Sequence, residues 1–133
     1  MTLSTSVETK TMQIQSFVYL CTALLTALVG AIYEKFSHMV YSDFMLYAFA
    51  IPLICGTFLL TLFLFLPKWK RPSKLTLRFW ASAVAVFTVG SLMQGVLEIY
   101  GTTNHLMKAY PIVGVAFVVL AVVCYLKTEC VTQ

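Results

Sequence analysis

The sequence predicts an all-α, polytopic membrane protein built as a bundle of four transmembrane helices. Of its 133 residues, 60% are hydrophobic and only 11% are charged. The mean hydropathy of +0.89 lies outside the balance of a water-soluble domain. Four apolar segments each reach the roughly 20 residues that a helix needs to cross a bilayer: about 12–33, 45–66, 75–98 and 106–126. Because irregular backbone cannot face lipid, we expect one membrane domain, residues 1–133.

The first apolar segment, 12–33, is interpreted as a retained helix and not as a cleaved signal peptide. A polar leader, MTLSTSVETK, precedes it, and its end lacks a small-x-small cleavage site. Small or polar residues recur at every fourth position, on one helix face: Thr22, Thr26, Gly30 and Glu34. Such a stripe lets membrane helices pack closely, so we expect it to face the bundle interior.

The second segment, 45–66, contains Pro52 with Gly56 after it. Proline has no backbone N–H, so we expect a kink at this position. The connector that follows, PKWKRPSK at 67–74, is a basic turn with Trp69 at headgroup depth. We interpret it as a topology signal that touches anionic lipid.

The third segment, 75–98, carries a second polar stripe, made of Thr88, Ser91, Gln94 or Gly95, and Glu98. The two stripes are expected to point toward the same place. The fourth segment, 106–126, has Pro111 near its start, where proline suits the first turn of a helix.

The basic residues predict the orientation of a multi-pass protein in the cell membrane. A cytoplasmic N-terminus leaves only Lys35 and Lys108 of the nine basic residues outside. The other seven then lie on the cytoplasmic side: Lys10, Lys68, Lys70, Arg71, Lys74, Arg78 and Lys127. Both termini are therefore expected in the cytoplasm, and the two histidines, His38 and His105, outside.

The two outer connectors share a pattern. An Ile-Tyr pair is followed by a histidine at the same spacing, in Ile32-Tyr33 with His38 and in Ile99-Tyr100 with His105. A duplication would give two pseudo-symmetric helical hairpins, related by an axis along the membrane normal. The halves align poorly elsewhere, so duplication and a chance match both stay open.

These connectors gather side chains that suit a quinone head at the outer leaflet. Hydrogen-bond donors hold the quinone oxygens, and carboxylates or imidazoles exchange protons. The proton-exchanging, catalytic candidates are Glu34, His38, Glu98 and His105. The cofactor-binding candidates are Tyr33, Tyr100, Gln94 and Asn104. Phe36, Met39, Phe44 and Met107 are expected to supply apolar walls.

Other chemistries find less support in the sequence. A haem buried between the helices is disfavoured because both histidines lie near the surface, although an outer-edge haem with two histidine ligands stays open. No local motif fixes a metal site, so none is predicted. The cysteines form no C-x-x-C pair, which argues against thiol-disulfide chemistry. No nucleic-acid module or phosphate-binding loop is present.

The strings YEKFSHMVYSDFMLYAFAIPL and GSLMQGVLEIYGTTN resemble small four-helix membrane proteins of Gram-positive bacteria that are associated with flavin-based extracellular electron transfer. The resemblance covers most of the membrane part and carries over no catalytic residue. It implies electron transfer from the menaquinone pool to an extracytoplasmic acceptor. Candidate partners are then the lipid bilayer, a membrane-bound dehydrogenase, an extracytoplasmic flavoprotein or further copies of the chain. The alternative is a non-enzymatic subunit that docks a larger partner or belongs to a small-solute transporter.

Overall fold

The computed structural model of the chain describes residues 2–37, 42–66 and 71–131. They form helices joined by short turns, and four segments are long and apolar enough to cross a membrane. The prediction of an all-α bundle of four membrane-spanning helices is therefore confirmed. The elements in chain order are α1 (Thr2–Phe36), α2 (Asp43–Leu46), the π-helix η1 (Ile51–Phe58), α3 (Leu59–Phe65), α4 (Lys74–Ile99), the 3-10 helix η2 (His105–Lys108) and α5 (Ala109–Val131).

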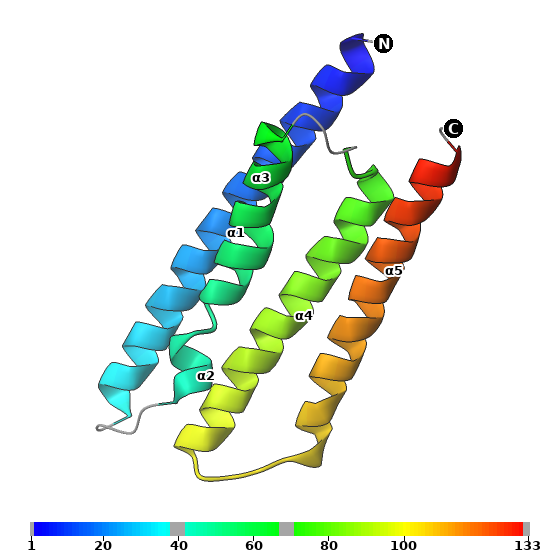
Figure 1. Ribbon diagram of the computed structural model, residues 1–133. Coiled ribbons are helices and arrows are strands. Elements are labelled where there is room, and N and C mark those ends of the chain that lie inside the picture. The colour runs from blue at the N-terminus through cyan, green and yellow to red at the C-terminus, as the bar shows by residue number, and fades with distance from the viewer. Residues whose placement is uncertain (1, 38–41, 67–70, 132–133) are drawn as a thin grey trace.

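The four spans run alternately in opposite directions (Figure 1). α1 and α4 run one way, whereas η1 with α3, and α5, run the other way, as short connections between neighbouring helices require. Both chain termini consequently lie at one end of the bundle, which we call the terminal end. At the opposite end α1 and α4 finish and α2 and η2 begin, and we call this the connector end.

The first helix begins at Thr2, well before the start expected at residue 12. The leader contains neither proline nor glycine, so nothing in it stops the helix from extending toward the N-terminus. A helix of 35 residues measures about 50 Å, which exceeds the roughly 30 Å of a hydrocarbon core. Its first turns accordingly extend beyond the neighbouring helices (Figure 1).

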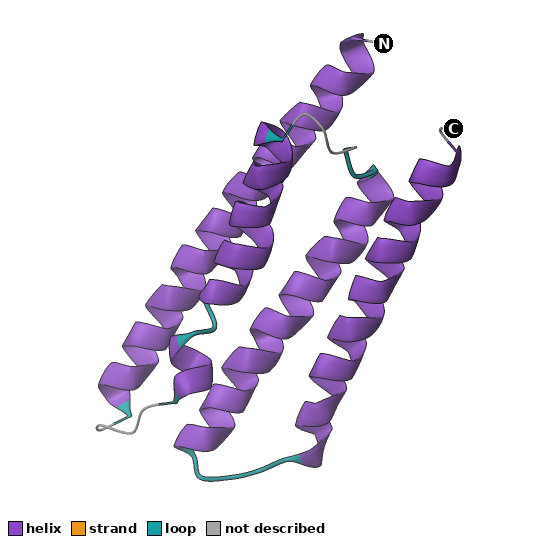
Figure 2. Cartoon of the chain, in the orientation of Figure 1, coloured by secondary structure: helices purple, strands orange, loops and turns teal. Residues whose placement is uncertain are grey.

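The second span is not the single α-helix that the range 45–66 predicted. After α2 the backbone N–H of Ala50 bonds to the carbonyl of Tyr47 at 3.0 Å, only three residues back. The chain then re-enters a helix as η1, with the buried Pro52 in its first turn (Figure 2). The irregularity expected at Pro52 is present, and it extends to a break that precedes the proline.

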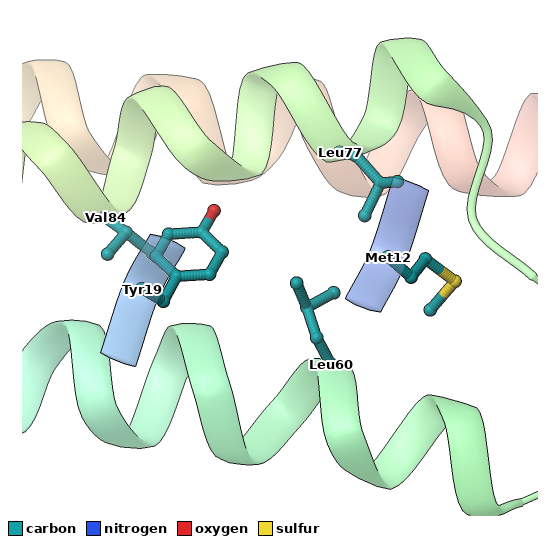
Figure 3. Packing of buried hydrophobic residues seen from close by; sticks show 5 residues of the cluster. All are labelled: Met12, Tyr19, Leu60, Leu77 and Val84. Carbon is teal, nitrogen blue, oxygen red and sulfur yellow. The ribbon is translucent and has the colours of Figure 1, made fainter. Parts of the chain in front are cut away.

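The apolar core lies in the half of the bundle nearer the terminal end. Its buried side chains come from α1, α3 and α4 and meet between the helices (Figure 3): Met12, Tyr19, Leu60, Leu77 and Val84. Tyr19 packs directly on Gly56 of η1, where a Cβ atom would overlap its ring. Many large apolar side chains of all four spans instead face outward, as a lipid bilayer around the bundle requires.

Glycines bring α4 and α5 close together. A Cβ atom at Gly114 would lie 2.7 Å from the ring of Phe87, and one at Gly90 would lie 2.7 Å from Cβ of Tyr110. Each aromatic side chain therefore packs against the backbone of the facing helix. This is the close approach that small residues allow between membrane helices.

Candidate functional site at the connector end

The short helix α2 is wedged between α1 and α4. Its Met45 side chain is 2% exposed. A Cβ atom at Gly95 would lie 2.7 Å from Cβ of Met45, and one at Gly30 would lie 3.3 Å from its carbonyl oxygen. The two polar stripes of the sequence thus meet at this helix, since each contributes the glycine that makes room for Met45.

Two short hydrogen bonds fasten α2 to α4. The hydroxyl of Ser42, which is 1% exposed, donates to Oε2 of Glu98 at 2.7 Å. The hydroxyl of Ser91 donates to the backbone carbonyl of Phe44, also at 2.7 Å. Ser42 occupies the N-cap position of α2 but makes no side-chain cap bond there, so its hydroxyl serves the contact with α4.

The tyrosines of the two Ile-Tyr pairs also meet. The phenol of Tyr33, at the end of α1, lies near that of Tyr100, at the end of α4. Tyr33 is half-buried, whereas Tyr100 is exposed. The ends of the first and third spans therefore lie close together at the surface of the connector end.

A cavity of about 580 Å³ lies beside α2, partly open to the surroundings. Its walls come from α2, η1, α4, η2 and the start of α5, and they are largely apolar and aromatic. The lining residues are Phe44, Ile51, Phe87, Gly90, Ser91, Gln94, Thr103, Asn104, Met107, Lys108, Tyr110 and Pro111. A cleft of this size with a few polar groups is typical of small-molecule sites.

The polar groups of this cavity are mainly hydrogen-bond donors. Asn104 caps η2, because its Oδ1 accepts from the backbone N–H of Leu106 at 3.0 Å, which leaves the amide NH₂ to donate. Gln94 contributes a second side-chain amide and Lys108 an ammonium group. Ser91 donates elsewhere, to the carbonyl of Phe44. The cavity therefore suits a flat, mostly apolar molecule that carries oxygen acceptors.

Of the eight residues proposed from the sequence, Gln94 and Asn104 line this cavity, together with the expected wall residues Phe44 and Met107. Glu98 stands one turn beyond Gln94 and is bound to Ser42. His105 is exposed in the first position of η2. Neither glutamate nor His105 is among the lining residues of this cavity, and a common site for Glu34, His38, Glu98 and His105 stays a prediction.

Glu34 is not among the residues that line the cavity. Glu34 is half-buried, and its Oε1 is buried without a hydrogen-bond partner among the described residues. His38 and Met39 lie outside the described residues. The positions of His38 and His105, which a duplication would make equivalent, are therefore not compared. The repeat therefore stays a prediction.

Sequence reasoning missed several residues of the connector end. Lys108 was read only as an outside charge, and Met45 was read only as the start of a span. The glycines at 30, 90 and 95 gave the available signal, because glycine inside a helix usually marks a close approach. Their partners could not be named, since those lie on helices distant in the chain.

The described residues contain no group of three or more histidine, cysteine, aspartate or glutamate side chains that could hold a metal ion. The fold is that of a four-span integral membrane protein with a cavity at the connector end. Comparison with protein families, with curated proteins and with solved structures finds no match to the chain.

Proposed function

We propose that this chain is a small integral protein of the cell membrane that acts in electron transfer from the menaquinone pool to an extracytoplasmic acceptor. The observation that carries the proposal is the cavity at the connector end, which joins aromatic walls to hydrogen-bond donors. The resemblance of the two quoted strings to membrane proteins of extracellular electron transfer supports the same function.

The proposal places the terminal end in the cytoplasm and the connector end outside. Seven of the nine basic residues belong to the N-terminal leader, to segment 67–78 or to the last turns of α5. Positive charge near the ends of the spans favours the cytoplasmic side. The cavity then lies at the outer leaflet, where electrons would leave for an acceptor outside the cell.

The residues present in the cavity fit a quinone head. The rings of Phe44, Phe87 and Tyr110 offer flat apolar surfaces, and the amides of Gln94 and Asn104 can donate to the head's oxygen atoms. When bound, a menaquinol supplies two electrons and two protons. The ammonium group of Lys108 would favour negative charge on the oxygen as a proton leaves, since opposite charges attract.

In this proposal Glu98, beside the cavity, passes protons to water. It is exposed, lies four residues after Gln94 on α4, and accepts a hydrogen bond from Ser42 that fixes its carboxylate. In this role Glu98 receives the proton and releases it to the outer solution, while His105 offers a second exposed base nearby in the chain. The electrons pass to the external acceptor, for which an extracytoplasmic flavoprotein is the proposed partner.

The test is purification in a mild detergent, followed by an optical spectrum and extraction of lipid-soluble cofactors. We expect menaquinone to copurify. Gln94→Leu should lower the bound quinone roughly fivefold, because one net hydrogen bond contributes about 1 kcal/mol. Gln13→Leu is the matched control, since Gln13 is exposed on α1 and lines neither described cavity.

Electron export to an impermeant oxidant such as ferricyanide gives the cellular measurement. Glu98→Gln and His105→Ala should slow export if these groups carry protons. A haem absorption band in the purified protein would replace the quinone by a haem. Absence of any cofactor, together with normal export by both variants, would refute the redox function and leave a docking subunit or transporter component.

A further inference from the structure

A second cavity, of about 200 Å³, lies nearer the terminal end and is also partly open to the surroundings. Aliphatic and aromatic side chains of α3, α4 and α5 line it. The polar groups of its α4 wall bind elsewhere: the indole N–H of Trp80 donates to the carbonyl of Cys55 at 2.8 Å, and the hydroxyls of Thr76 and Ser73 pair at 3.0 Å. The cavity therefore suits hydrocarbon.

Both cavities lie on the same face of α4. Thr76 and Trp80 line the second cavity, whereas Phe87, Ser91 and Gln94 line the first. These positions follow one another at intervals of four, seven, four and three residues, which keeps them on one side of a helix. α4 thus forms a common floor for the two cavities.

The same holds for α5. Pro111 lines the first cavity, Ala121 and Tyr125 line the second, and Gly114 lies between them at intervals of three and seven residues. On the other side, Ile51 of η1 contributes to the first cavity and α3 to the second. Both cavities are therefore bordered by α4 and α5, the first also by η1 and the second also by α3.

We infer that the two cavities bind one molecule: a quinone head in the first and its polyprenyl chain along α4 into the second. The inference rests on the proposed function and deepens it by assigning the chain of menaquinone to a site of its own. From Gln94 in the first cavity to Thr76 in the second, α4 rises about 27 Å, close to the roughly 30 Å of the hydrocarbon core. A long chain parallel to the helices fills that length, and a head without a chain does not.

The polarity of the two cavities fits this orientation of the ligand. Gln94, Asn104 and Lys108 stand at the connector end, and the second cavity offers only apolar contacts. Phe87 packs on Gly114 at the inner end of the first cavity, so its ring marks the point where head and chain would join. A soluble electron carrier has no hydrocarbon chain to fill the second cavity. The second cavity therefore favours a prenylated quinone.

The experiment measures equilibrium binding of menadione, which lacks a chain, and of menaquinones of increasing chain length to the purified full chain. Val122→Trp fills the second cavity at a position that is already 47% exposed, so the fold should tolerate it. Val123→Trp is the matched control, because Val123 is 43% exposed and lies outside the lining.

We expect long-chain menaquinone to bind more tightly than menadione, and Val122→Trp to weaken its binding roughly tenfold, the effect of losing a few packed methylenes. Val123→Trp should leave the affinities for menaquinone and menadione unchanged. Val122→Trp should leave the affinity for menadione unchanged. Equal affinities for all chain lengths, insensitive to Val122→Trp but lowered by Gln94→Leu, would overturn the inference and keep the proposed function. Absence of quinone binding would overturn both.

Discussion

Gly95→Ala adds a single methyl group where α4 packs against Met45 of α2, and so tests this contact. The new Cβ atom would lie 2.7 Å from Cβ of Met45, 3.0 Å from its nitrogen and 3.1 Å from its Cα. Two of these atoms belong to the backbone, so no rotation of the methionine side chain relieves the overlap. α2 must move away from α4 if the methyl group is to fit.

The size of the effect follows from these distances. Carbon atoms pack at about 3.5 Å or more, so α2 must retreat by roughly 1 Å. A displacement of that size stretches the bonds of Ser42 to Glu98 and of Ser91 to Phe44, both 2.7 Å now, beyond hydrogen-bonding range. Overpacking costs about 1–3 kcal/mol, and each membrane hydrogen bond contributes about 0.6. Alanine returns up to about 1 kcal/mol of helix propensity, so we expect a net loss of about 1–3 kcal/mol.

The assay is unfolding by sodium dodecyl sulfate in mixed micelles, followed by circular dichroism. Gly30→Ala provides the comparison, because its Cβ atom would meet only the carbonyl oxygen of Met45, at 3.3 Å, and should cost less. A second measurement uses the thiol of Ser42→Cys. Position 42 is buried, so the thiol should react faster with aqueous maleimide when Gly95→Ala is also present. If Gly95→Ala changes neither the stability nor the labelling, the close packing of Met45 on Gly95 is refuted.

Three further predictions concern other contacts. Trp80→Phe removes the 2.8 Å bond to a carbonyl of η1 and should lower thermal stability by about 1 kcal/mol; equal stability would mean that this bond contributes nothing. Ser42→Ala should cost about 0.6 kcal/mol alone but nothing when added to Glu98→Ala, and additive losses would contradict their pairing. An impermeant maleimide should label Thr103→Cys on intact cells and leave Ser73→Cys unlabelled, whereas the reverse would invert the proposed orientation.

The number of spans was predictable because lipid imposes a minimum apolar length on each of them. The break between α2 and η1 was harder to place. Pro52 indicated an irregularity, but the turn before it depends on Met45 fitting between two helices, which is a tertiary contact. The early start of α1 was missed because a polar leader carries no hydropathy signal, although its residues permit a helix.

The candidate site, too, depends on tertiary contacts that the sequence does not show. Helical spacing put Thr88, Ser91 and Glu98 on one face, and that face does meet α2 through Ser91 and Glu98. Spacing along one helix could not show what faces it from another. Gln94 lines the cavity, whereas Glu98, four residues later, bonds to Ser42 and is not among the lining residues.

The position of α2 has a consequence for the order in which the chain assembles during synthesis. A helix of four residues cannot be stable alone. Gly95, one of the two glycines that make room for Met45, emerges from the ribosome some fifty residues after Met45. The first and second spans can therefore enter the bilayer, but α2 has no complete docking surface until the third span is inserted. The connector end, and the cavity beside it, becomes a late product of membrane insertion.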